Sequence, residues 1–129
     1  MVRMFLNGQA MRGGEFHPLL GDAPFLGVVR TAPGHRFFSI RDVCPGLLPD
    51  PAVDTAIEGE LYEVSLEFLR DVLLPGEPPE LAFGVIKLAD GSACFSMVLA
   101  PGELERGVHK EITEFGGWRA CLATLGREF

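Results

Sequence analysis

Short apolar runs separated by glycine and proline dominate this chain and predict a protein rich in β-strands. The first run covers residues 2–6, is apolar almost throughout and ends at Asn7-Gly8, which is typical of a strand in the middle of a sheet. Further strands are predicted at 25–31, 35–40 and 56–64, and a helical turn at 16–20. The proline-rich segment 44–51 is expected to be an ordered loop with edge character, because proline cannot donate to a strand ladder.

Two alternating apolar runs between residues 81 and 99 surround Asp90-Gly91 and predict a β-hairpin. This dipeptide favours a two-residue type I′ turn, and the turn fixes how the two strands pair. The expected pairs on the core-facing side are Leu88 with Ala93, Ile86 with Phe95 and Gly84 with Met97.

Two helices are predicted in the second half of the chain. One covers 66–74 and begins after Ser65, which is a favourable N-cap. The other closes the chain and has an apolar stripe with helical spacing at Trp118, Cys121, Leu122 and Leu125. Strands outnumber helices and no strand–helix–strand repeat occurs. We therefore expect one α+β domain over residues 1–129, built as a small mixed, mostly antiparallel β-barrel with a few short helices.

The composition narrows the possible functions. The net charge is −7 and the arginines are scattered singly, so nucleic acid is not an expected partner. No apolar run approaches the about 18 residues that a membrane helix needs, and the N-terminus does not have the pattern of a signal peptide. The three cysteines have no CxxC spacing and no histidine pair has metal-ligand spacing. We expect no metal, no cofactor, no membrane and a reduced, cytoplasmic protein.

The loop after the first strand is a candidate binding site. Glycines at 8, 13 and 14 follow directly on the apolar run. A strand that ends in a glycine-bearing turn leaves several backbone N–H groups unpaired, and such a concavity suits a carboxylate or another small anion. The alternative is that these glycines serve only tight turns, and composition alone favours this alternative.

Two groups of motifs resemble known families. The first half is similar to the gamma-glutamylcyclotransferase-like superfamily in Phe5-Leu6-Asn7-Gly8-Gln9-Ala10-Met11-Arg12-Gly13 and in His17-Pro18-Leu19-Leu20. The second half resembles the C-terminal domain of allophanate hydrolase, above all in Glu111-Ile112-Thr113-Glu114-Phe115-Gly116-Gly117-Trp118-Arg119-Ala120. Allophanate hydrolases carry an amidase domain before this one, and 129 residues leave no room for it, so we expect a free-standing relative.

The resemblance implies roles for the first loop and for one acidic loop. It places the substrate-binding residues at Asn7, Gly8, Gln9, Ala10, Met11 and Arg12. Ala10 stands where the allophanate hydrolase domain carries a histidine linked to decarboxylation, and Pro75 stands where active cyclotransferases carry a general acid/base glutamate. The remaining candidates for that role are Glu80, placed first, and Glu77, placed second. The alternative for both is a loop glutamate that is merely exposed to solvent.

Three functional hypotheses follow from these observations. The first is a protein that binds a small carboxylated amide or ureido compound and serves urea, allophanate or related amide degradation, by a decarboxylation-type step beside a separate amidase. The second is a gamma-glutamylcyclotransferase-type enzyme that uses Glu80 or Glu77. The third is a non-catalytic partner of an amidase, and self-association is a further alternative.

Overall fold

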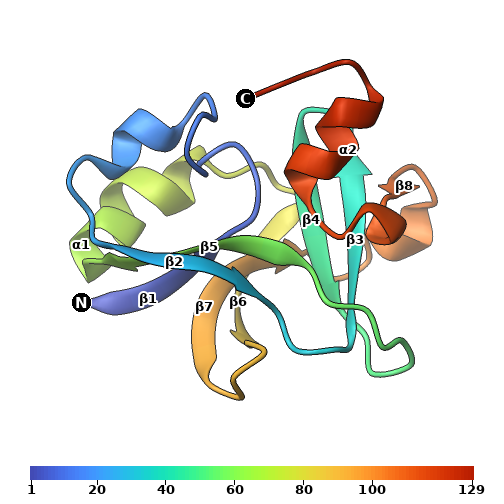
Figure 1. Ribbon diagram of the computed structural model, residues 1–129, viewed down its shortest axis with the longest axis horizontal. Coiled ribbons are helices and arrows are strands. Elements are labelled where there is room, and N and C mark those ends of the chain that lie inside the picture. Colours follow the sequence, from blue (N-terminus) through green and yellow to red (C-terminus); the bar gives the residue numbers. More distant parts are fainter.

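A computed structural model describes residues 1–129 as two β-sheets flanked by short helical segments (Figure 1). The larger sheet has the strand order β2-β5-β1-β7-β6, and the smaller one the order β4-β3-β8. The strands are β1 (Val2–Leu6), β2 (Phe25–Arg30), β3 (His35–Ile40), β4 (Cys44–Pro49), β5 (Glu58–Val64), β6 (Leu81–Lys87), β7 (Ala93–Leu99) and β8 (Lys110–Glu111). The helical segments are η1 (His17–Leu20), α1 (Leu66–Phe68), η2 (Leu69–Leu73), η3 (Leu74–Gly76), η4 (Leu104–Arg106), η5 (Thr113–Phe115) and α2 (Trp118–Thr124). The molecule is a small α+β protein.

Strand β1 lies in the middle of the larger sheet, as its apolar sequence predicts. It pairs antiparallel with β5 and parallel with β7, so the sheet is mixed. Met4, Phe5 and Leu6 are all buried. Neighbouring strands on both sides therefore fix the point at which the first loop leaves the sheet.

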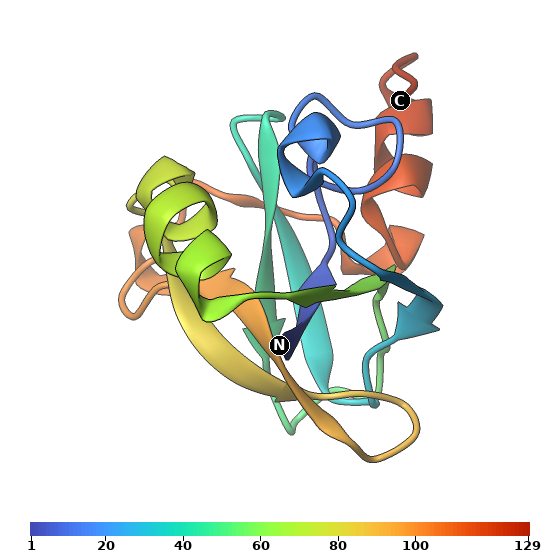
Figure 2. The same ribbon diagram turned by 90° about the vertical axis from the view of Figure 1, so that its left-hand side faces the viewer.

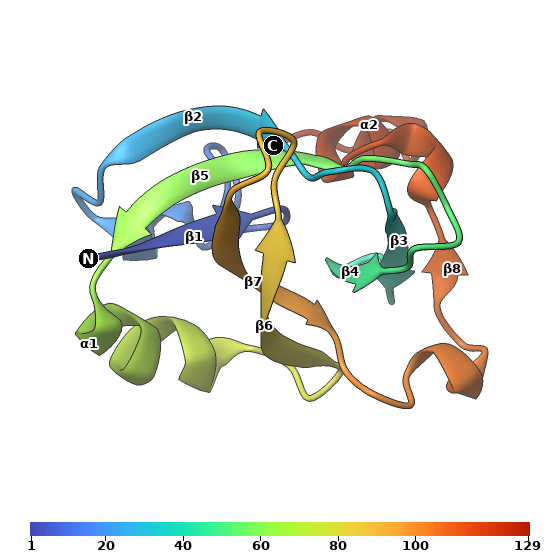
Figure 3. The same ribbon diagram turned by 90° about the horizontal axis from the view of Figure 1, so that it is seen from below.

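The larger sheet is curved, and Figure 3 shows the β6–β7 hairpin standing across the direction of β2 and β5. Its two edges meet at one end, where Thr31 and Leu88 form an isolated antiparallel bridge. The Ala32 N–H also donates to the Lys87 carbonyl over 2.9 Å. The Ala89 N–H donates in turn to the Arg30 carbonyl over 3.0 Å, and the pairing of the two edges does not continue beyond this bridge. The sheet is thus curved, with its two edges meeting over one isolated bridge. No closed barrel is found, so the expected small β-barrel is not confirmed.

The prediction of a loop at 44–51 is wrong for most of that segment. Residues Cys44–Pro49 form β4, which pairs with β3 over six residues at the edge of the smaller sheet. Pro45 and Pro49 are an even number of residues apart, so their nitrogens lie on the same side of the strand. An edge strand leaves alternate N–H groups unpaired, and prolines at such positions remove no ladder hydrogen bond.

The β6–β7 hairpin is present, but its predicted register is wrong by one residue. Of the turn residues only Gly91 has a positive φ, of 88°, whereas a type I′ turn would need a positive φ at Asp90 as well. The Leu88 N–H donates to the Ser92 carbonyl over 2.8 Å, which gives a three-residue loop with a bulge at the glycine. The observed pairs include Lys87 with Ala93, Ile86 with Cys94, Val85 with Phe95, Gly84 with Ser96 and Phe83 with Met97.

The predicted helix at 66–74 is a continuous but irregular helical segment. Ser65 caps it as predicted, since its hydroxyl accepts a hydrogen bond from the Phe68 N–H over 3.0 Å. One turn of α-helix is followed by a π-helical stretch and a 3₁₀ turn. Figure 2 shows this segment and α2 on opposite sides of the molecule.

One main hydrophobic core joins the larger sheet, the smaller sheet and α2. Trp118 and Phe37 are completely buried in it, together with Phe5 from the central strand. The apolar stripe predicted for the last helix is buried at Trp118, Cys121 and Leu122. None of the helices combines the length and the apolar character that crossing a bilayer requires.

Candidate functional site

The first loop begins with three backbone N–H groups that have no hydrogen-bond partner. None of the hydrogen bonds of the structure uses the backbone N–H groups of Gly8, Gln9 or Ala10. The loop is nevertheless well defined, because the Met11 N–H donates to the Gly8 carbonyl over 3.1 Å and the Phe16 N–H to the Gln9 carbonyl over 3.0 Å. Three consecutive unpaired N–H groups on an ordered loop have the character of an anion-binding nest.

The glycines of this loop also have packing roles. A Cβ atom on Gly8 would lie 2.6 Å from Cδ of Pro45, and one on Gly14 would collide with the Gln9 carbonyl. Gly13 has a φ of 86°, which side chains rarely adopt. Tight turns and close packing therefore explain why these residues are glycines. These packing roles do not explain the unpaired N–H groups of Gly8, Gln9 and Ala10.

The main cavity of the molecule, of about 540 Å³, opens above this loop. Four parts of the chain form most of its walls: the first loop with the end of β1, the segment around η1, the β3–β4 turn, and the η2–η3 segment with the following loop. Leu81 of β6, Met97 of β7 and Arg127 near the C-terminus complete the lining. Asn7, Gly8, Gln9 and Ala10 all line it. The polar side chains of its lining, besides Asn7 and Gln9, are those of Glu15, Arg41, Glu77 and Arg127.

Glu77 lines the main cavity without a partner. No hydrogen bond or ion pair of the structure involves its carboxyl group, and burial raises its pKa to about 7. A carboxyl group with this pKa is present in both protonation states near neutral pH. It can therefore give or accept a proton, which is what a general acid/base needs.

Glu80 lies in the same loop but has different surroundings. Its side chain is buried, is not part of the lining of the main cavity, and forms an ion pair with Arg41. The hydrogen bond from that guanidinium lowers the pKa of Glu80, so this carboxyl group is held in its ionised form. The two candidate glutamates thus lie in one loop, but their environments shift their pKa values in opposite directions.

Arg41 is a cavity residue that the sequence pattern does not identify. It lies in the β3–β4 turn, where both Arg41 and Asp42 have positive φ angles, of 57° and 55°. The Val43 N–H donates to the Ile40 carbonyl over 3.0 Å and closes this turn. A left-handed arginine costs on the order of 1 kcal/mol, and such costs are concentrated at functional positions. A scattered arginine between two strands carries no signal that would have marked it in the sequence.

Met11 and Arg12, the last two of the predicted binding residues, lie outside the main cavity. Met11 is buried in the core. Arg12 binds the completely buried carboxylate of Glu60 through its backbone N–H at 2.9 Å and its Nε at 3.0 Å. Arg12 therefore anchors the loop to β5, and Met11 anchors it in the core.

Glu60 joins three parts of the molecule. Besides the two bonds from Arg12, it accepts hydrogen bonds from the Tyr62 hydroxyl and from Nη2 of Arg119, each over 2.9 Å. Burial alone would raise the pKa of Glu60, but the hydrogen bonds from Arg12, Tyr62 and Arg119 outweigh it and lower the pKa. The sequence pattern gives no hint of this cluster, because its members come from the first loop, β5 and α2.

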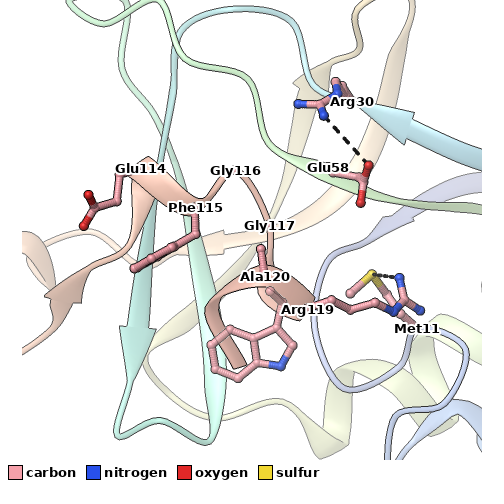
Figure 4. Close-up of a pocket in the computed structure, with 10 residues that line it drawn as sticks. Met11, Arg30, Glu58, Glu114, Phe115, Gly116, Gly117, Arg119 and Ala120 are labelled. Carbon is pink, nitrogen blue, oxygen red and sulfur yellow. Dashed lines mark hydrogen bonds and ion pairs between the residues drawn. The ribbon is translucent and has the colours of Figure 1, made fainter. Parts of the chain in front are cut away.

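A second pocket, of about 410 Å³, lies where α2 meets β5 (Figure 4). Arg119 extends toward Met11 on one side, and Arg30 and Glu58 lie across from the helix as a 3.9 Å ion pair. The Glu58 N–H donates to the Gly116 carbonyl over 2.8 Å, and Gly116 has a φ of 71°. This part of the string 111–120 therefore docks α2 onto the sheet.

The curved mixed sheet and the first loop have the gamma-glutamylcyclotransferase-like fold, in agreement with the solved structures described below. More narrowly, the chain belongs to the allophanate hydrolase C-terminal domain family, whose model matches residues 2–123. Both statements agree with the resemblance seen in the sequence.

Solved structures support this assignment. A uropathogenic E. coli-specific protein is similar over 99% of this chain and 98% of its own, with 32% identity and a TM-score of 0.85. Kluyveromyces lactis allophanate hydrolase has a TM-score of 0.86 at 21% identity, and the match covers 96% of this chain but 21% of that one. A mouse AIG2-like protein has a TM-score of 0.63 at 23% identity, over 81% and 82% of the two chains. Among the curated proteins none matches.

Proposed function

We propose that the protein binds a small carboxylated amide or ureido compound in the main cavity. The observation that carries this proposal is the set of three unpaired N–H groups at Gly8, Gln9 and Ala10, three residues that line the same cavity as Arg41 and the unpaired carboxyl of Glu77. Backbone N–H groups and a guanidinium are the donors that a carboxylate needs. The protonated Glu77 supplies a further donor, and its ionised form accepts from an amide N–H.

The reaction that we place first is a decarboxylation-type step beside an amidase. When an N-carboxylated amide loses carbon dioxide, the C–N bond breaks and its electron pair stays on the nitrogen, which then takes a proton. Glu77 is the proton donor that the cavity offers, and water restores its proton afterwards. Ala10 cannot replace the histidine that related domains carry, so this role falls to Glu77.

Two alternatives share the same cavity. In a cyclotransferase reaction the ionised Glu77 would take a proton from the attacking amine and return it to the leaving amine, and its pKa of about 7 supports that exchange. A non-catalytic role as the ligand-binding partner of an amidase is supported by Kluyveromyces lactis allophanate hydrolase and urea amidolyase, in which the matching part is 21% and 8% of the chain. Because the match covers only these small parts of the two proteins, the activities of the whole proteins are proposals for this chain.

Calorimetry with malonate, followed by turnover assays, tests the proposal. We expect malonate to bind the wild-type protein and the Glu105→Gln variant equally, because Glu105 is exposed and remote from the cavity lining. Release of carbon dioxide from N-carboxylated ureido compounds is expected to fall at least about 100-fold in Glu77→Gln and to persist in Glu105→Gln. Turnover of γ-glutamyl amides that depends on Glu77 would establish the cyclotransferase alternative. Absence of malonate binding would refute all the ligand-binding proposals.

A further inference from the structure

Exposed apolar side chains gather at the mouth of the main cavity. Phe16, Leu19, Val43 and Val72 line the cavity and are 49%, 57%, 55% and 38% exposed. They come from three separate parts of the chain: the η1 segment, the β3–β4 turn and η2. Large apolar side chains that converge from three segments on one cavity form a surface that water solvates poorly. We call these four residues the apolar rim.

The apolar character continues inside the cavity. Phe5, Leu6, Leu73, Leu81 and Met97 also line it. Together with the four rim residues, Ala10 and Cys44, they make 11 of the 21 lining residues hydrophobic. The polar groups are fewer and come from the first loop, Glu15, the β3–β4 turn, Glu77 and Arg127. The cavity therefore offers a polar site for a head group together with apolar walls that a purely polar ligand would leave unused.

The volume of the cavity also indicates a ligand larger than a polar head group alone. If each non-hydrogen atom takes the ~30 Å³ of a water molecule in the liquid, a dicarboxylate of seven such atoms fills on the order of 200 Å³. The cavity has about 540 Å³. More than half of it remains for other parts of the ligand.

We propose that the carboxylated compound bound in this cavity carries an apolar chain of several carbons, which lies against the apolar rim. This proposal rests on the proposed function, because the polar head group is placed at the N–H groups of Gly8, Gln9 and Ala10. The head group fixes the orientation of the ligand, and the chain contributes affinity through the surface it removes from water. A flat docking surface for a protein would leave the donors at the cavity floor without partners, whereas a small amphiphilic molecule satisfies both ends.

A series of alkylmalonates tests the inference by calorimetry at pH 6. Malonate, propylmalonate and hexylmalonate share one head group and differ in the length of the alkyl chain. We expect the affinity to rise up to about fourfold for each methylene group until the cavity is filled. Equal or weaker binding of hexylmalonate compared with malonate would overturn the apolar-chain proposal but leave the proposed function standing. Failure of every member of the series, malonate included, would refute the proposed function itself.

Two variants of the rim distinguish binding at this site from non-specific binding of the alkyl chain. Leu19→Asn and Val72→Asn are expected to reduce the gain of hexylmalonate over malonate at least about fivefold, because each variant removes apolar surface from the rim while the N–H groups of Gly8, Gln9 and Ala10 stay in place. Val85→Asn is the matched control, since Val85 is 64% exposed and lies outside the cavity lining. The same loss in Val85→Asn would show non-specific binding and contradict the inference. The wild-type protein could instead form a dimer that dissociates in the rim variants, while hexylmalonate binds no more tightly than malonate. This result would show that a second copy of the chain covers the rim and would overturn the inference.

Discussion

Burial without a hydrogen-bond partner gives Glu77 a pKa of about 7, whereas an arginine beside Glu80 keeps that residue ionised. Both are glutamates of one short loop, and the sequence pattern places Glu80 ahead of Glu77. The cavity geometry favours Glu77 instead, because only Glu77 lines the cavity and has no partner. The chemistry of each residue is decided by segments that are distant in the sequence.

The first prediction concerns the pH dependence of binding. The ionised Glu77 repels a bound anion, so we expect the dissociation constant of malonate to rise about tenfold between pH 6 and pH 8. In Glu77→Gln the dissociation constant is expected to change less than about threefold over the same range. Calorimetry at several pH values measures both. A wild-type profile that matches the variant would contradict the role of Glu77.

The second prediction concerns stability. The pKa of Glu77 is raised above its ordinary value of 4.5, so its contribution to stability is fully present below about pH 4.5 and is lost as the pH rises to about 7. Glu77→Gln cannot ionise, and we expect it to be more stable than the wild type at pH 8, by at most about 3 kcal/mol, and equally stable at pH 4. Urea unfolding at the two pH values checks this. A variant less stable than the wild type at pH 8 would show that Glu77 has a stabilising partner.

At the scale of elements, local signals in the sequence predict most strands but not the details that depend on pairing. The structure confirms the apolar run of β1 and the N-cap of α1. The predicted stripe of the last helix is buried at Trp118, Cys121 and Leu122, but Leu125 follows the end of α2 and is exposed. The loop predicted at 44–51 is wrong because edge pairing with β3 tolerates the prolines of this segment. The register of the β6–β7 hairpin differs by one residue because Asp90 bonds to Ser92, with its carboxylate accepting from the N–H at 2.9 Å and from the hydroxyl at 2.6 Å.

The third prediction concerns the attachment of the first loop to β5. Glu60→Gln removes the charge that Arg12 and Arg119 share, and we expect a loss of about 2 to 3 kcal/mol in the free energy of unfolding. Hydrogen exchange of the loop amides should become faster at the same time. Glu58→Gln is the matched control on the same strand, because its ion pair with Arg30 is half-exposed and about 3.9 Å long. The control should lose no more than about 1 kcal/mol. Equal losses in both variants would contradict the role given to Glu60.

The fourth prediction concerns the β3–β4 turn. Arg41→Asn places a residue that tolerates left-handed backbone at the strained position and removes the guanidinium from the cavity. We expect malonate to bind at least about tenfold more weakly, since a charge-assisted hydrogen bond is lost, and the free energy of unfolding to fall by about 1 to 3 kcal/mol, because the buried Glu80 carboxylate loses its ion-pair partner. Arg70→Asn is the control, because Arg70 is exposed and lies outside the cavity lining. Unchanged malonate affinity in Arg41→Asn would remove Arg41 from the site.

At the scale of the whole molecule, the site exists because the curved sheet brings together loops from four parts of the chain. The sequence identifies one wall of the cavity, the first loop, through its resemblance to a known family and through its glycines. It does not identify Arg41, the Glu60 cluster or the apolar rim, since their members are brought together only by the fold. Of the predicted binding residues, Asn7, Gly8, Gln9 and Ala10 line the cavity. Met11 and Arg12 instead anchor the loop to the rest of the molecule.

The fifth prediction tests the central claim, that the first loop is the floor of an anion site. In a titration of the isotopically labelled protein with malonate at pH 6, we expect the amide signals of Gly8, Gln9 and Ala10 to shift and saturate together. The amides of Gly116 and Gly117, in the second pocket, should remain unchanged. Saturable shifts confined to 8–10 are the predicted result. Shifts at 116–117 instead, or no saturable shift at the first loop, would contradict the claim.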